Sequence, residues 1–116
     1  MRVEADLFSG RPNPVWTLDA DEADDLADLL RLLAHDGAAP EPPGLGYRGM
    51  VVHGVETALP GCTSVRAFRG AASAECGGSP RVYADPDRGL ERWLVETARR
   101  RLDPDLFAVI QAEVGE

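Results

Sequence analysis

The sequence predicts a single α+β domain over residues 1–116, with three helices packed on one face of a small, mainly antiparallel sheet. Three patterns predict this fold class. Polar and apolar residues alternate at the start of the chain, an apolar helical period follows Asp19, and two Asp-Pro pairs, at 85–86 and 103–104, mark helix starts. The predicted order of elements is β-β-α-β-β-β-α-α.

The first half of the chain is predicted to form a hairpin, a helix and a third strand. Residues 2–8 alternate as in a half-buried strand, and residues 15–18 form its hairpin partner. Asp19 is a predicted N-cap, with Glu22 completing a capping box, and Gly37 ends the helix. Residues 38–46 form a Pro- and Gly-rich loop, and residues 47–55 form the third strand. The apolar side of the helix carries Leu26, Leu29, Leu30 and Leu33.

The second half is predicted to hold two more strands and two helices. Residues 64–72 form one strand, and residues 81–84 form another after a turn at Gly77-Gly78. Asp85-Pro86 places a cap residue before proline, which predicts a helix that ends in the arginines 99–101, and Asp103-Pro104 predicts the last helix. Their apolar sides are Leu90, Trp93, Leu94, Ala98 and Leu102, and Leu106, Phe107, Ile110 and Val114.

Charge and composition exclude several classes of function. The net charge is −8 and all twelve basic residues are arginine, so chemistry that needs a lysine amine is impossible. Nucleic acids and anionic membranes attract clustered positive charge, so neither is an expected partner. No signal peptide or membrane span is recognisable, which predicts a cytoplasmic protein. Abundant Ala, Gly, Pro, Arg and Asp are typical of a high-GC bacterial genome, such as an actinobacterial one.

The most informative segment is Phe8-Ser9-Gly10-Arg11-Pro12-Asn13-Pro14-Val15-Trp16. Two prolines stiffen this loop, and Gly10 permits a backbone angle that other residues avoid. The loop is predicted to present Arg11 rigidly, either to the protein's own backbone or to a ligand. Trp16 and Trp93 are predicted core residues, although an exposed Trp16 would instead be typical of a binding hot spot.

Two motif matches lack the context that their chemistry needs. Residues 44–49 fit the dinucleotide pattern G-x-G-x-x-G, but a loop precedes them and a strand follows, whereas the pattern requires a strand and then a helix. The second possible match is a zinc site made of two histidines and two cysteines. Zinc ligands usually come as close pairs, and these four residues are widely spaced. We therefore expect no metal site and no cofactor. The potential ligands are His35, His53, Cys62 and Cys76.

A disulfide between Cys62 and Cys76 is not expected either. A continuous strand over residues 64–72 would span about 30 Å at ~3.3 Å per residue, whereas bonded cysteines have Cα atoms within about 7 Å. Two free, partly buried thiols are the predicted state.

Three residues are candidates for catalysis, and each also has a plainer interpretation. Cys76 could be a nucleophile with His53 or His35 as its base, or simply a small residue beside a hairpin turn. His53 lies among valines in a predicted strand, where histidine commonly packs, and His35 near a helix C-terminus suits the helix dipole. Tyr47 is a candidate for proton transfer.

Four arginines lie in predicted loops or strands: Arg11, Arg48, Arg66 and Arg69. Arg66 and Arg69 would point to opposite faces of a regular strand, so only one of them can join Arg11 and Arg48 around a carboxylate or phosphate. The alternative, favoured by the acidic composition, is internal pairing with acids. The acids considered are Glu4, Asp6, Glu56 and Asp85.

Two segments resemble a signature of small uncharacterised proteins from high-GC bacteria. One is the run from Phe8 to Pro14 followed by Trp16, and the other is Leu45-Gly46-Tyr47-Arg48-Gly49. The resemblance implies no activity, substrate or catalytic residue. It implies that the two segments meet in space, with Arg11 beside Tyr47 or Arg48.

The sequence therefore predicts a non-catalytic binding or accessory protein that recognises a protein or peptide partner. Its binding surface would be the loop from Ser9 to Trp16 and an adjacent sheet edge. Two alternatives stay open: a small enzyme or small-molecule binder that holds an anionic ligand with Arg11 and Arg48, and a structural homodimer subunit. The predicted binding residues are Arg11, Asn13, Trp16, Tyr47 and Arg48.

Overall fold

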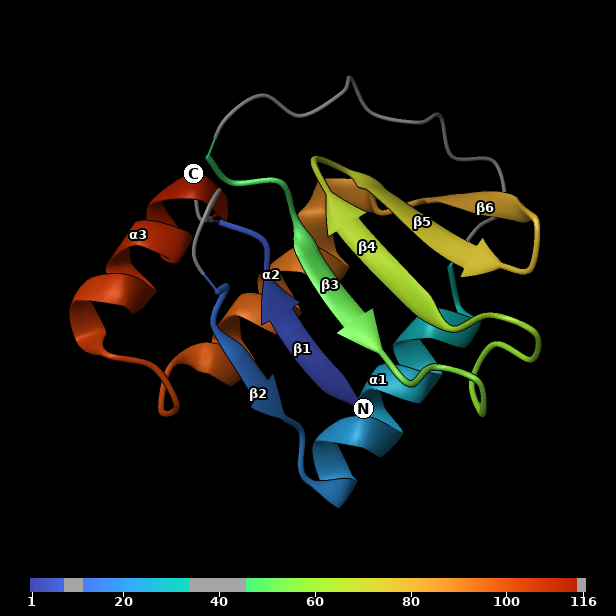
Figure 1. The fold of residues 1–116 in the computed structure, drawn as a ribbon, viewed down its shortest axis with the longest axis horizontal. Coiled ribbons are helices and arrows are strands. Elements are labelled where there is room, and N and C mark those ends of the chain that lie inside the picture. The colour runs from blue at the N-terminus through green and yellow to red at the C-terminus, as the bar shows by residue number, and fades with distance from the viewer. Residues whose placement is uncertain (8–11, 34–45, 115–116) are drawn as a thin grey trace.

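The computed structural model describes residues 1–7, 12–33 and 46–114 and confirms the α+β class (Figure 1). One sheet of six antiparallel strands has the order β2-β1-β3-β4-β5-β6. The strands are β1 (Arg2–Ala5), β2 (Val15–Thr17), β3 (Met50–His53), β4 (Ser64–Phe68), β5 (Ala71–Cys76) and β6 (Ser79–Ala84). The helices are α1 (Ala20–Arg31), a short 3₁₀ helix η1 (Pro86–Arg88), α2 (Gly89–Ala98) and α3 (Pro104–Val114).

The two faces of the sheet differ in character. Val3 and Ala5 of β1 and Val52 of β3 point into the core and are fully buried. Arg2 and Glu4 alternate with them and lie on the opposite face, because successive side chains of a strand point to opposite sides. Figure 1 looks onto this second face, with α1 and α2 behind the sheet and α3 beside α2. No helix among the described residues covers it, and we call it the open face.

Helix α1 begins where the sequence predicts, but it ends at Arg31 rather than at the predicted Gly37. The Asp19 side chain accepts a hydrogen bond from the Glu22 backbone amide, and the Glu22 side chain accepts one from the Asp19 amide. This reciprocal capping box fixes the first turn. Leu26 and Leu30 are buried, and Leu33 packs against the edge of the core.

The segment predicted as one strand over residues 64–72 is a hairpin, so that prediction was wrong. Arg69 and Gly70 form a two-residue turn with φ of 48° and 88°, and Phe68 pairs with Ala71 across it. Two positive φ values are what such a turn needs, and the usual Asn-Gly or Asp-Gly signal is absent. The second turn, at Gly77-Gly78, lies where the sequence predicted it.

This hairpin also overturns the prediction of two free thiols. Because β5 runs back along β4, Cys76 returns to the level of Cys62, and the two are joined in a disulfide with Cα atoms 3.9 Å apart. The error followed from reading the intervening segment as fully extended. Cys62 is fully buried, so the bond ties the loop before β4 into the core.

The helix predicted to start at Pro86 starts at Gly89. Asp87 and Arg88 have φ of 58° and 56°, so the chain makes a short 3₁₀ turn before α2 begins. Asp85 still caps this helix, because its buried carboxylate accepts hydrogen bonds from the amides of Leu90 and Glu91 at 2.8 and 3.2 Å. Helix α3 begins at Pro104 as predicted. None of the helices in the described ranges is long and apolar enough to cross a membrane.

Candidate functional site

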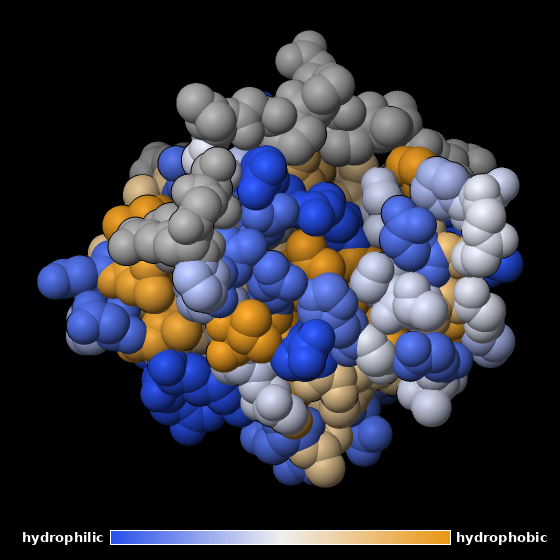
Figure 2. Space-filling model, viewed as in Figure 1, coloured by the Kyte–Doolittle hydropathy of each residue, from blue (hydrophilic) through white to orange (hydrophobic). Residues whose placement is uncertain are grey.

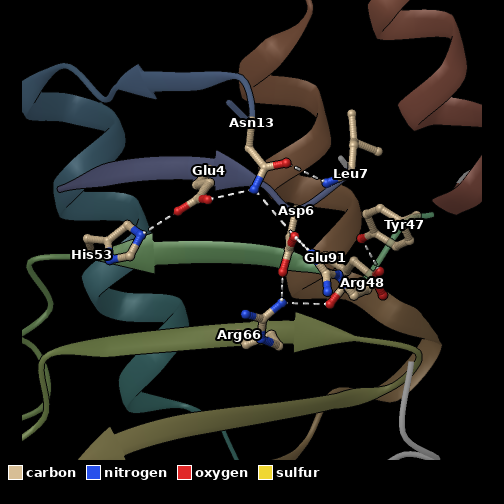
Figure 3. Close-up of polar contacts among 9 residues, drawn as sticks. All are labelled: Glu4, Asp6, Leu7, Asn13, Tyr47, Arg48, His53, Arg66 and Glu91. Atoms are coloured by element: carbon tan, nitrogen blue, oxygen red, sulfur yellow. Dashed lines mark hydrogen bonds and ion pairs between the residues drawn. The ribbon is translucent and has the colours of Figure 1, made fainter. Parts of the chain in front are cut away.

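An ion-pair cluster on the open face joins Asp6 to two arginines (Figure 3). Arg48 Nη2 lies 3.0 Å from Asp6 Oδ1, and Arg66 Nη1 lies 2.7 Å from Asp6 Oδ2. Arg66 Nη1 also donates to the Arg48 carbonyl oxygen at 2.8 Å. Of the acids considered as internal partners, Asp6 is the one that pairs with these arginines. Arg69 lies at the β4–β5 turn with its guanidinium over the Phe68 ring, so only Arg66 joins Arg48.

The charges of this cluster follow from the surroundings of Asp6. Burial on its own would raise the pKa of the Asp6 carboxyl, but the hydrogen bond and charge of Arg66, with those of Arg48, outweigh it. The net effect is a pKa below the usual value, so Asp6 is ionised at neutral pH. The carboxylate is 11% exposed, whereas the side chains of Arg48 and Arg66 are 38% and 42% exposed. The cluster thus turns its positive groups toward solvent.

Asn13 braces the base of the predicted binding loop against β1. Its Oδ1 accepts a hydrogen bond from the Leu7 amide at 3.0 Å, and its Nδ2 donates to Glu4 at 2.8 Å and to Asp6 at 3.3 Å. Glu4 in turn contacts His53 Nε2 at 2.9 Å. The hydrogen bond from Asn13 and then that from His53 lower the pKa of the Glu4 carboxyl. A predicted binding residue therefore links the loop to the charged groups of the open face.

Gly49 lets Arg66 lie close to the backbone at this corner. Its φ is +118°, and a Cβ placed there would lie 2.9 Å from the Ala67 carbonyl oxygen and 3.1 Å from Arg66 Cγ. Only glycine fits both the angle and the space. The stem of Arg66 consequently packs directly over the chain that leads from Arg48 into β3.

A second polar cluster, around Glu91 of α2, is buried. The Tyr47 hydroxyl donates to Glu91 Oε2, Arg88 holds the same carboxylate through Nε and Nη2 at 2.8 and 2.9 Å, and the Arg69 amide donates to it at 3.0 Å. Glu91 is fully buried. Burial and then the neighbouring carboxylate raise the pKa of the Tyr47 hydroxyl, so it stays protonated. Tyr47 thus anchors the chain just before β3.

Glu91 was not singled out from the sequence, although a signal exists. It shares helical spacing with Leu94, Val95 and Ala98, which are all buried, so it lies on the core side of α2. Arg88, three residues earlier, supplies the matching charge. The only non-glycine residues with positive φ in the described ranges are Arg69, Asp87 and Arg88, and two of these three bind Glu91 directly. The strained backbone there serves to satisfy one buried carboxylate.

The three catalytic candidates belong to separate clusters. His53 pairs with Glu4, Tyr47 with Glu91, and Cys76 is held in the disulfide. No group of three or more potential metal ligands occurs within the described ranges. Residues 46–49 of the glycine pattern lead into strand β3 rather than a helix. His35 lies outside the described residues.

Trp16 is a core residue, as the plainer interpretation predicted. Its side chain is 6% exposed, and its indole nitrogen donates to Thr97 Oγ1 on α2 at 2.8 Å. Arg11 lies outside the described residues. That it lies beside Tyr47 or Arg48 therefore stays a prediction. Val15, next to Trp16 on the edge strand β2, is 48% exposed and lies opposite Glu4.

Two surface hollows lie apart from the Asp6 cluster. One of about 330 Å³ is formed by residues at the other end of β1, including Arg2, Thr17 and His53. A larger one, of about 540 Å³, lies between α1 and the end of β3 and is lined by Asp24 and Asp28 among others. None of the residues in the Asp6 cluster lines either hollow. The cluster is a polar surface, not a pocket.

Comparison of the chain with protein-family models, with curated proteins and with solved structures finds no match.

Proposed function

We propose that this chain is a non-catalytic binding protein that recognises a protein or peptide partner where the loop from Ser9 to Trp16 adjoins the open face. The observation that carries the proposal is the position of Asn13. It holds the described end of the loop to Leu7 and to the carboxylates of Glu4 and Asp6. A loop with a fixed base loses less conformational entropy when a partner binds.

The surroundings of the loop suit such a surface. Val15 exposes an apolar side chain beside Glu4, and the ion pairs of Asp6 lie next to it. Figure 2, in the same view, shows hydrophilic residues across the middle of this face with apolar surface between them. Binding surfaces commonly combine exposed apolar contacts with polar groups that are already ordered.

Affinity purification with four versions of the tagged protein tests the proposal. Arg11→Ala and Val15→Ser alter the proposed surface, and Val109→Ser is a matched control because Val109 is 53% exposed on the distant α3. We expect one protein to be enriched equally by the wild type and by the control. The two variants with an altered surface should enrich it at least about tenfold less than the wild type does. Far-ultraviolet circular dichroism establishes that all four are folded. Equal recovery by all four, or no enrichment over the tag alone, would refute the proposal.

A small anionic ligand is a second candidate, and one observation favours it. The Arg48 side chain is 38% exposed and, among the described residues, donates only through Nη2, so its guanidinium can still donate to an anion. Native mass spectrometry compares the folded and denatured masses of gently purified protein. A bound small anion would appear as a fixed excess that Arg48→Ala removes, and an unchanged mass would argue against this candidate. The same spectrum tests the predicted homodimer.

The cytoplasmic location and the high-GC bacterial source remain predictions from composition. The disulfide bears on the first of them, because such bonds persist mainly in oxidising compartments. Thiol titration of denatured protein, alkylated at the moment of cell lysis, distinguishes the two cases. Two alkylated cysteines would fit a reducing cytoplasm, and none would favour an oxidising compartment.

A further inference from the structure

The guanidinium groups of Arg48 and Arg66 hold more hydrogen-bond donors than the described residues use. Each guanidinium carries five N–H donors. Among the residues that the structure describes, Arg66 donates only through Nη1, to Asp6 and to the Arg48 carbonyl, and Arg48 donates only through Nη2, to Asp6. The Nε and Nη2 of Arg66 form a complete edge with no partner in the described ranges, on a side chain that is 42% exposed. Such an edge matches the two oxygens of a carboxylate.

The charges around this edge also favour an anion. One carboxylate, Asp6, faces two guanidiniums, which leaves one positive charge uncompensated within the cluster. Glu4, the next acid along β1, contacts Asn13 and His53 and forms no ion pair with Arg48 or Arg66 within the described ranges. Asp6 and Gly49 fix the positions of both arginines before anything binds.

The size of the anion follows from the rest of the molecule. The chain as a whole carries a net charge of −8, which repels a polyanion at long range. A single carboxylate is attracted by the two guanidiniums at short range, and dissolved salt screens much of its long-range repulsion by the rest of the chain. The Arg66 side chain is 42% exposed on a face that no described helix covers, so its edge is accessible to a side chain of a peptide partner. The acceptor that fits is therefore an Asp or Glu side chain within a peptide.

We propose that the partner presents the carboxylate of an Asp or Glu side chain to Arg48 and Arg66, with the free edge of Arg66 as its principal donor. This inference rests on the proposed binding function, because it names the chemistry of the partner at the same surface. The carboxylate accepts hydrogen bonds from arginine N–H groups that otherwise donate only to water. The contact is a charge-assisted hydrogen-bonded pair, and Asp6 is its positioning residue.

The test uses a phage-displayed library of random twelve-residue peptides selected on the full chain. Enriched peptides are synthesised with each Asp changed to Asn and each Glu to Gln, and with free or amidated C-termini. Calorimetry measures their affinity for the wild-type protein and for Arg66→Lys, which keeps the charge but loses the fork. Arg81→Lys, an exposed arginine on the far edge strand β6, is the matched control.

We expect one acidic side chain in each peptide to be essential, with its amide variant binding at least about tenfold more weakly, as charge-assisted pairs predict. The Arg66→Lys protein should lose affinity for the acidic peptide and should distinguish acid from amide less sharply, because the paired donors are lost while the charge remains. The control should bind like the wild type. Peptides that bind equally well as amides would overturn the carboxylate while leaving the proposed function standing. Dependence on the free C-terminus alone would overturn it too. If no peptide is enriched over a tag-only surface, both proposals fail.

Discussion

Trp16 Nε1 donates a 2.8 Å hydrogen bond to Thr97 Oγ1, which ties the edge strand β2 to the helix α2 across 81 positions of sequence. The Thr97 hydroxyl itself donates to the Leu94 carbonyl oxygen at 2.6 Å, so the pair is part of a satisfied, buried chain of donors and acceptors. Trp16 therefore supports the loop before it from inside the core.

Replacing Trp16 with Phe should destabilise the fold without weakening partner binding. The ring remains, but Thr97 loses a buried donor, which costs about 1–3 kcal/mol. Chemical denaturation measures the change in unfolding free energy. The Thr97→Val variant should cost a similar amount, and the double variant should cost less than the sum. Strict additivity would show that the hydrogen bond contributes nothing.

The Glu91→Gln variant should be much less stable than the wild type. The change removes the charge that holds Arg88 and one acceptor of Tyr47 and Arg69, inside a fully buried site. Breaking one partner of a buried ion pair typically costs about 3–5 kcal/mol. Thermal and chemical unfolding measure this loss.

The control for Glu91 lies on the same helix. Glu96 holds Arg99 through two hydrogen bonds with the same three-residue spacing, but both side chains are more than half exposed. Glu96→Gln should leave stability nearly unchanged, because exposed ion pairs are screened by water. Equal losses at Glu91 and Glu96 would contradict the role assigned to the buried cluster.

Reduction of the Cys62–Cys76 bond should lower stability. The bond closes a loop of 14 residues, and a loop of about this length contributes on the order of 3 kcal/mol by restricting the unfolded chain. Denaturation with and without a reductant measures the difference. A Cys62→Ala, Cys76→Ala double variant should unfold as easily as the reduced protein and ignore the reductant. Two titratable thiols in the native, oxidised protein would contradict the structure.

Acid should weaken the contact between α1 and the end of α2. Arg101 donates to both oxygens of Glu22, and this hydrogen bond, more than the competing effect of burial, lowers the Glu22 pKa from 4.5 to about 2. Because the folded value is depressed, the stabilisation is complete above about pH 4.5 and is lost as the pH falls toward 2. Unfolding free energy measured at intervals between pH 6 and pH 2 checks this.

The Glu22→Gln variant isolates this contribution. It should be less stable than the wild type at pH 6, and the difference should shrink as the pH falls. Asp25→Asn serves as the control on the same helix, because Asp25 is exposed and forms no ion pair with the residues that the structure describes. A constant difference between wild type and Glu22→Gln across the range would refute the assignment.

A methyl group at Gly49 should disturb the Asp6 cluster as well as the backbone. Gly49→Ala places Cβ within 3.1 Å of Arg66 Cγ and nearer still to a carbonyl oxygen, so both strain and a shift of Arg66 are expected. Gly61→Ala is the control, since Gly61 also has positive φ but open space around its Cβ. Both variants should lose about 1 kcal/mol from the backbone angle, and Gly49→Ala clearly more. Similar losses would show that the close approach is tolerated.

Patterns of residues close in sequence predicted the individual helices and strands better than the contacts between them. The capping box at Asp19, the apolar side of α1 and the Asp103-Pro104 start depend on residues near in sequence, and all are confirmed. The Arg69-Gly70 turn was missed because it lacks the usual turn residues, and the disulfide was missed with it. Glu91 was missed because its partners, Tyr47 and the Arg69 amide, lie far away in the chain. At the site, Asp6 was predicted only as one of four acids considered as partners for an arginine.

The strand order carries a consequence for how the chain reaches its native state. Strands β1 and β2 form one local hairpin and β3 to β6 another local series, so each can form early from contacts close in sequence. The β1–β3 pairing closes a far longer loop, which contains β2 and α1, and pays the larger entropy of closure. Asp6 bonds to Arg48 and Arg66 across that same seam, 42 and 60 positions away. The ion pairs of Asp6 thus cross the boundary between two local groups of strands, and weakening them should slow folding or speed unfolding at the β1–β3 pairing.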